Sequence, residues 1–281
     1  MSTKLVFRCA RLGVLVVLVA AFTGPAAAAP AGNGHGGGGG GGGGSRAGDQ
    51  YVALGDSFSS GVGTGSYTLD RACKRSVYAY PYLLAQQRKN TSLTFVACSG
   101  ATTVDLLASQ IQSVTSKTTI VTLTIGGNDI GFADLIYQCT IGDCTTALES
   151  TTATLESTLG GKLDQVYTTI KARAAAGAKI IVLGYPHEFS GATCGGTLGI
   201  SAAEESDANK LADALDEVIS AHAAKDNVTY QSAIQPFTGH EVCSSSPWLN
   251  GLNLFNTGES YHPNRAGHSS GYLPLVRAIT R

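Results

Sequence analysis

A serine that follows a short apolar segment is the first candidate for chemistry. Residues 51–54 (Tyr-Val-Ala-Leu) lead directly into Gly55, Asp56 and Ser57. A tight glycine-flanked turn after a strand exposes the serine hydroxyl and frees its backbone N–H, as a nucleophile beside an oxyanion requires. Gly, Asp and Ser are also the commonest turn residues, so an ordinary turn is the alternative interpretation.

Two further polar segments follow apolar runs. Gly100 lies in residues 97–102 (Ala-Cys-Ser-Gly-Ala-Thr) and could bring its backbone N–H close to a ligand; the alternative is a capped helix N-terminus. Asn128 lies in residues 126–129 (Gly-Gly-Asn-Asp), where its side-chain N–H can point at an oxyanion. The alternative there is a turn with Asn in the left-handed region.

One of the six histidines has the setting of a general base. His262 precedes Pro263, which fixes the following backbone and predicts a helix over 263–276, so the imidazole lies at a loop-to-helix junction. The other histidines of the folded region are interpreted as surface or packing residues: His187, His222, His240 and His268.

A second serine motif matches only part of a known nucleophile pattern. Residues 267–271 (Gly-His-Ser-Ser-Gly) match the G-x-S-x-G nucleophile elbow, which needs an acid and then a histidine later in the chain. No Asp, Glu or His follows Ser269. We therefore assign Ser269 to the final helix.

The remaining pattern predicts alternating strands and helices. Strands are expected at 51–54, 93–97, 120–125 and 179–183, and helices at 80–88, 103–111, 146–176, 201–224 and 263–276. Continuous apolar strands that alternate with helices indicate a mostly parallel sheet covered on both faces. Functional groups of such proteins gather at the carboxyl ends of the strands, where each motif above falls.

The first 48 residues have the composition of an export signal and a tether. Residues 1–29 combine three basic residues, an apolar run too short to span a bilayer, and a small-residue end, which predicts a cleaved signal peptide and a secreted protein. A retained anchor is the alternative. Residues 30–48 are Gly-rich and are predicted to be a flexible linker, which leaves 49–281 as one domain.

Charge and cysteine content limit the partners. The chain has 19 basic and 20 acidic residues, and cleavage of the signal leaves 16 against 20, a net charge of −4 that favours no nucleic acid partner. An even number of cysteines in an exported chain predicts three disulfides, with fifteen possible pairings: Cys73, Cys98, Cys139, Cys144, Cys194 and Cys243. Zinc is the alternative, but no C-x-x-C or H-x-x-x-H pair supports it.

Taken together, the four motifs resemble the SGNH, or GDSL, hydrolase family, especially the secreted lipases and esterases of Streptomyces-like bacteria. The resemblance implies an α/β fold, a flavodoxin-like three-layer α/β/α sandwich. It implies Ser57 as nucleophile, His262 as general base, and an oxyanion hole built from the N–H groups of Ser57 and Gly100 and the Asn128 amide. It also implies sequential cysteine pairing: Cys73 with Cys98, Cys139 with Cys144, and Cys194 with Cys243.

One position departs from the family pattern. The last block usually reads Asp-x-x-His, but Glu259 stands at the Asp position here. Some members of the family orient the histidine with a main-chain carbonyl instead. Glu259 as a third triad member, and a carbonyl of Glu259 or Ser260 as the acceptor, both stay open.

The resemblance implies acyl-enzyme hydrolysis of lipid-like esters by a monomer, with no metal or cofactor and with transient contact to a lipid surface. Esters of carbohydrates (acetyl or feruloyl), acyl transfer to an alcohol, and an inactive binding module are the alternatives. Aromatic platforms would favour carbohydrate, and an apolar groove would favour lipid. The aromatic residues near the motifs are Tyr78, Tyr80, Phe132, Trp248 and Tyr261.

Overall fold

A five-stranded parallel sheet forms the centre of the molecule. The computed structural model describes residues 48–281, and the predicted signal peptide and nearly all of the predicted linker lie outside them. The strands are β1 (Asp49–Ala53), β2 (Thr91–Phe95), β3 (Ile120–Leu123), β4 (Lys179–Leu183) and β5 (Thr229–Gln231), in the order β2-β1-β3-β4-β5. All neighbouring pairs are parallel. This is the flavodoxin-like order, whose topological switch point lies between β1 and β3.

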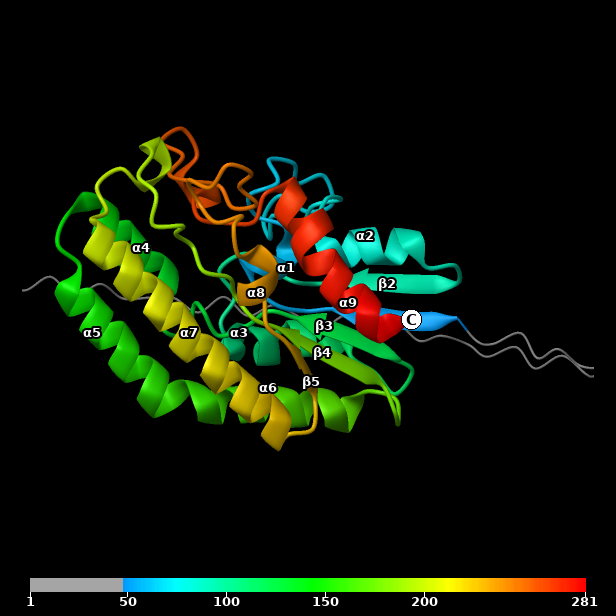
Figure 1. Ribbon diagram of the computed structural model, residues 1–281. Coiled ribbons are helices and arrows are strands. Elements are labelled where there is room, and N and C mark those ends of the chain that lie inside the picture. The colour runs from blue at the N-terminus through cyan, green and yellow to red at the C-terminus, as the bar shows by residue number, and fades with distance from the viewer. Residues whose placement is uncertain (1–47) are drawn as a thin grey trace, which may run out of the picture. The chain divides into compact units, whose positions relative to one another are not determined.

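Helices cover both faces of this sheet (Figure 1). One face carries α2 (Tyr80–Gln87) and α9 (Leu273–Thr280). The other carries α3 (Thr103–Ala108), α6 (Gly160–Arg173) and α7 (Ala202–Lys225). The remaining helices are α1 (Ser57–Ser60), α4 (Phe132–Ile141), α5 (Thr145–Thr154) and α8 (Ile234–Phe237). The predicted three-layer α/β/α sandwich is confirmed.

Burial explains why the apolar runs form the central strands. All four residues of β3 are buried, as are the last four of β4, because helices exclude water from both of their faces. The predicted strands and most of the predicted helices are present with small shifts at their ends. The helix expected over 146–176 runs through α5, a π-helical turn (Leu155–Leu159) and α6, and ends at Arg173.

Apart from the four-residue helices α1 and α8, which the sequence did not predict, the main differences concern three elements. The last helical segment begins at Arg265, not at Pro263, because the Asn264 Oδ1 atom accepts hydrogen bonds from the N–H groups of Ala266 (2.9 Å) and Gly267 (3.1 Å) and caps it. The prediction also missed β5, which is short and polar. It missed α4, although Leu135, Ile136 and Cys139 form a buried face at helical spacing.

Three disulfides join segments that lie outside the central strands. They join Cys73 to Cys98, Cys139 to Cys144, and Cys194 to Cys243, which is the pairing that the family resemblance implied. Glu204 lies beside the second pair, but both sulfurs are bonded to each other and are not free thiolate ligands for a metal. Within residues 48–281, no helix combines the length and the apolar character that a membrane crossing requires.

Candidate active site

Ser57 and His262 meet at the carboxyl edge of the sheet, although 205 residues separate them in the chain. Ser57 Oγ lies 2.8 Å from His262 Nε2. Ser57 follows β1, at the switch point of the sheet, and His262 comes from the loop that precedes the final helical segment. A serine hydroxyl within hydrogen-bond distance of an imidazole is the arrangement that activates an oxygen nucleophile.

The turn after β1 fixes Ser57 as the first residue of a short helix. The Asp56 carboxylate caps α1 by accepting from the N–H of Phe58 (3.0 Å), and it also accepts from the hydroxyl of Thr124 (2.6 Å). Gly55 has φ +121°, and a Cβ atom there would lie 2.5 Å from the Thr124 carbonyl oxygen. The strand-turn-helix geometry therefore holds Ser57 in place, with only 7% of its surface exposed.

A backbone carbonyl contacts the other ring nitrogen of His262. His262 Nδ1 lies 2.7 Å from the carbonyl oxygen of Ser260. The Glu259 carboxylate forms no hydrogen bond to His262 in the structure; it accepts instead from the Tyr67 hydroxyl (2.7 Å) and the Asn256 amide (2.9 Å). Glu259 thus joins two loops beside the site, and the Ser260 carbonyl holds Nδ1–H so that Nε2 faces Ser57.

Three potential oxyanion donors come from three strand ends. The Ser57 N–H opens α1 and so has no partner within that helix. Gly100 follows β2 with φ +82°, a conformation that favours glycine, and its N–H donates to no other residue within 48–281. The Asn128 amide follows β3 and donates one N–H to the Ala101 carbonyl (3.0 Å), which fixes the side chain and leaves its second N–H for a ligand.

A cavity of about 490 Å³ opens beside Ser57 and His262. Ser57, Asn128 and His262 line one part of it. The rest is mostly apolar and comes largely from α4, α7 and two loops. Its apolar residues include Phe132, Ile136, Leu198, Leu215, Leu252 and Leu254. This shape presents an apolar ligand to the serine hydroxyl.

Burial sets the protonation of the two titratable groups next to Ser57. Desolvation lowers the pKa of His262 to about 4, with the nearby Lys74 acting in the same direction, so the imidazole is neutral and can accept a proton at neutral pH. Desolvation raises the pKa of Asp56 to about 6, against the opposing hydrogen bonds from Thr124 and Tyr185. Asp56 is therefore mainly a carboxylate acceptor at pH 7.

Three residues that position this site had no clear sequence signal. The Tyr185 hydroxyl bonds to Asp56 and accepts from the N–H of Gly127 (3.2 Å), linking the ends of β1, β3 and β4. Asp129 accepts from the N–H of Thr103 (2.8 Å) and so joins the Asn128 turn to α3. Asn250 donates its backbone N–H to the His262 carbonyl (2.9 Å).

The aromatic residues near the motifs separate into two groups. Phe132 and Tyr261 line the cavity. Tyr80 is fully buried, Trp248 stacks on His240 at 3.7 Å between ring centroids, and Tyr78 lies under the Arg265 guanidinium. None of these three lines the cavity.

The second serine motif and the other histidines lie away from the site. Ser269 is exposed within the π-helical turn Gly267–Tyr272, so its assignment to the final helical segment is confirmed. His268 is fully buried and accepts from the N–H of Tyr80 (3.3 Å), which is a packing role. His187, His222 and His240 contact Asp213, Asp164 and the Ser246 carbonyl, respectively.

Comparison with known proteins places this geometry in a family. The chain is 45% identical to Lipase 1 of Streptomyces coelicolor over 235 residues, which are 82% of this chain and 86% of the relative. The crystal structure of an extracellular lipase from Streptomyces rimosus superimposes with a TM-score of 0.78 at 42% identity, covering 83% of this chain and all of that one. Phospholipase A1 from Streptomyces albidoflavus gives 0.77 at 43% identity, with coverage of 83% and 99%. Residues 53–269 match the model of the GDSL-like Lipase/Acylhydrolase family, and the chain therefore belongs to this family of carboxylic ester hydrolases.

Proposed function

We propose that the protein is a serine esterase that hydrolyses lipid-like carboxylic esters through an acyl-enzyme. The observation that carries this proposal is the 2.8 Å contact between Ser57 Oγ and His262 Nε2 at the mouth of a mostly apolar cavity. The family and the relatives named lipase and phospholipase A1 support the same substrate class.

The proposed reaction has two acyl-transfer steps. His262 Nε2 takes the hydroxyl proton as Ser57 Oγ bonds to the ester carbonyl carbon. The N–H groups of Ser57 and Gly100 and the amide of Asn128 stabilise the oxyanion. The carbon–oxygen bond to the alcohol then breaks, and His262 returns the proton to the departing alcohol. Water repeats the sequence on the acyl-enzyme, its proton passing through His262 to Ser57, and the carboxylic acid leaves.

The lining of the cavity favours an acyl chain over a sugar. Leu198, Leu254 and Ile141 line the cavity and are also more than half exposed, so apolar surface continues from the cavity to its rim. Phe255 projects fully into solvent next to Leu254. An exposed apolar rim of this kind fits transient contact with a lipid surface, which brings the ester bond to Ser57. Of the five aromatic candidates for a sugar platform, Tyr78, Tyr80 and Trp248 lie outside the lining, whereas Phe132 and Tyr261 belong to it.

The test is hydrolysis of p-nitrophenyl esters from acetate to palmitate by the wild type, Ser57→Ala and His262→Ala. Each substitution removes one half of the pair, so kcat should fall to the assay floor, a loss on the order of 10⁶-fold. Ser269→Ala is the matched control, because it removes an exposed serine from the other motif. A preference for long chains is expected. Retained activity in Ser57→Ala, or a strict acetate preference, would contradict the proposal, and transfer to added alcohol would indicate an acyltransferase.

Export is part of the same proposal. The signal peptide over 1–29 and the linker over 30–48 stay predictions, which N-terminal sequencing of the exported protein tests. Three disulfides support an oxidising compartment, because such bonds rarely persist in a reducing cytosol. The related Streptomyces rimosus structure is named as an extracellular lipase.

A further inference from the structure

The apolar cavity contains an acidic group that the acyl transfer does not use. Glu188 lies five residues after β4, lines the same cavity as Ser57, and is only 2% exposed. Its Oε2 atom is buried without a hydrogen-bond partner in residues 48–281, and no hydrogen bond or ion pair of its other oxygen is present there either. Buried carboxyl groups are nearly always paired, so an unpartnered one in a ligand cavity calls for a functional explanation.

Hydrogen bonds hold the backbone around Glu188 in place, so the position of its side chain at the cavity wall is fixed by the fold. Asn209 of α7 accepts from the N–H groups of Glu188 (3.1 Å) and Phe189 (3.2 Å), and its own amide donates to the Phe189 carbonyl (2.7 Å). The Glu188 carbonyl accepts from the N–H of Val242 (2.9 Å). These four bonds fix Glu188 from two sides at the wall of the cavity.

The surroundings of the carboxyl group favour its uncharged form. Burial raises the pKa of Glu188 well above its usual value. The other titratable residues that line the cavity provide no positive charge at neutral pH: Asp56, Tyr137, Tyr185, Tyr261 and His262. A neutral carboxylic acid is at once an O–H donor and a carbonyl acceptor. Placed in an apolar wall, it favours ligands that offer a matching oxygen over ligands that do not.

We infer that Glu188 recognises a substrate oxygen remote from the ester bond that is cut, either a hydroxyl on the acyl chain or the carbonyl of a neighbouring ester. The preferred substrates are then oxygenated lipid esters and not plain alkyl esters. This inference rests on the proposed function of the cavity as the substrate site. Glu188 would thus select substrates by a polar contact, whereas the apolar part of the lining selects them only by chain length and size.

The experiment compares kcat/KM for matched substrates that differ in one oxygen. The first arm compares p-nitrophenyl palmitate with p-nitrophenyl esters of palmitate that carry one hydroxyl group, placed at different positions along the chain. The second arm uses a glycerol 1,2-diester against the analogue in which the 2-position carries an ether and so lacks the carbonyl. We expect the wild type to favour at least one oxygenated substrate by roughly 3- to 10-fold, the range for one net hydrogen bond. The arm that shows the preference identifies the source of the oxygen.

The variants separate recognition from a structural role. Glu188→Leu should abolish the preference and raise kcat/KM on the plain chain, whereas Glu188→Gln, which keeps a donor and an acceptor, should retain most of it. Glu205→Gln is the matched control, since Glu205 is also buried but does not line the cavity. The ratio of two substrates on one preparation does not depend on the fraction of protein that is folded.

The outcomes distinguish this inference from the proposed function. The role of Glu188 is overturned if the wild type cleaves plain and oxygenated esters equally. It is also overturned if Glu188→Leu keeps the wild-type ratio of kcat/KM between the two substrates. Either result leaves the esterase proposal intact. Wild type that cleaves no ester in either arm overturns both.

Discussion

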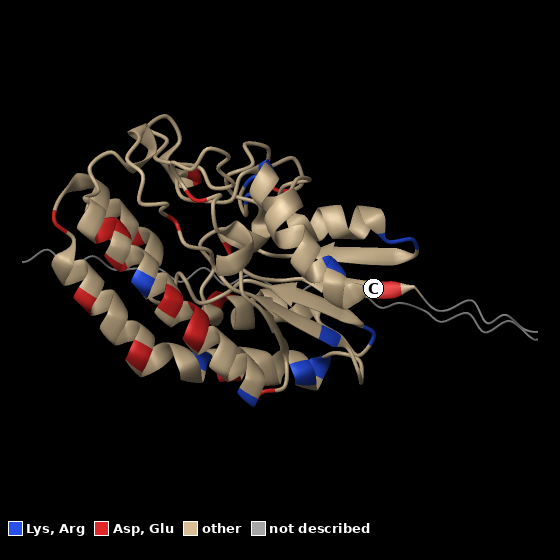
Figure 2. Ribbon diagram, in the orientation of Figure 1, with Lys and Arg blue, Asp and Glu red and all other residues tan. Residues whose placement is uncertain are grey.

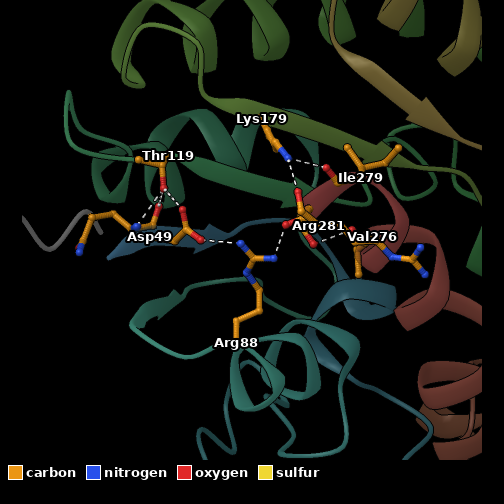
Figure 3. A network of polar contacts seen from close by, with 9 residues as sticks. Asp49, Arg88, Thr119, Lys179, Val276, Ile279 and Arg281 are labelled. Atoms are coloured by element: carbon orange, nitrogen blue, oxygen red, sulfur yellow. Dashed lines mark hydrogen bonds and ion pairs between the residues drawn. The ribbon is translucent and has the colours of Figure 1, made fainter. Parts of the chain in front are cut away.

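The two edges of the central sheet use charged residues in opposite ways. At the amino edge, where the strands begin, Arg88 bonds to the Asp49 carboxylate (2.5 Å), as Figure 3 shows. It also bonds to the Thr280 carbonyl at the end of α9. Lys179, which begins β4, donates to the carbonyl of Ile279 (2.7 Å) and also to that of Arg281. Figure 2 shows Lys and Arg segments gathered at this end of the sheet.

At the carboxyl edge the titratable groups beside the cavity have no charged partner. Asp56, Glu188 and His262 are not in any ion pair within residues 48–281. Desolvation shifts the pKa of each toward its uncharged form. The charges of the amino edge are paired and partly solvated, which fastens the chain terminus. At the carboxyl edge, Glu188 and His262 are buried beside the cavity, shifted toward their uncharged forms and without an ion-pair partner in residues 48–281. Stability and chemistry should therefore respond to different substitutions.

The largest effect expected at the carboxyl edge, apart from the loss of Ser57 or His262, is that of Asn128→Ala. Removing one oxyanion donor should lower kcat roughly 10²–10³-fold with little change in KM, because the donor acts mainly on the transition state. Steady-state kinetics and a thermal melt check this. A loss below about fivefold with an unchanged melting temperature would remove Asn128 from the oxyanion hole.

An intermediate effect is expected in the pH dependence. The neutral imidazole is the base, so kcat/KM should fall about tenfold per pH unit only below pH 4, and not below the usual histidine value of 6.5. Lys74→Gln should move this limb upward, because the Lys74 charge disfavours the imidazolium, and Lys89→Gln at the amino edge should not.

Titration of Asp56 is the alternative explanation that the same pH profile can detect. Its pKa of about 6 lies in the range where an ordinary histidine would titrate. A limb near pH 6 that disappears in Asp56→Asn would assign the acid limb to Asp56, and the expectation for His262 would be wrong.

The smallest effect belongs to the amino edge. Arg88→Met removes one ion pair and one bond to the end of α9, both screened by partial exposure, and should cost about 1–2 kcal/mol of stability. This corresponds to a fall of about 2–8 °C in melting temperature for a domain of this size. The kcat per folded enzyme should stay unchanged, and Arg277→Met, exposed on α9, is the control. A drop in kcat without a drop in melting temperature would show that the amino edge also affects catalysis, and would contradict the division of roles between the two edges.

Local patterns were enough to predict most of the sandwich and one part of the site. Strands β3 and β4 are branched apolar runs between turn residues, which only a buried strand explains well. Ser57 and Asn128 could be proposed as site residues because each lies a few residues after the end of an apolar strand, β1 and β3 respectively. Strand β5 carried too little apolar signal, since its three residues are only half-buried.

The sequence by itself determined four of the five strands, the turn that carries Ser57 and the histidine proposed as its base, because each depends on a few neighbouring residues. Only the tertiary structure decided that the Ser260 carbonyl contacts His262, that Glu259 bonds to Tyr67 192 residues away, and that Glu188 enters the substrate cavity. These contacts join segments that are distant in the chain, or depend on which way a loop turns. No local periodicity records them, because they form only when the strands have paired and brought their ends to one edge.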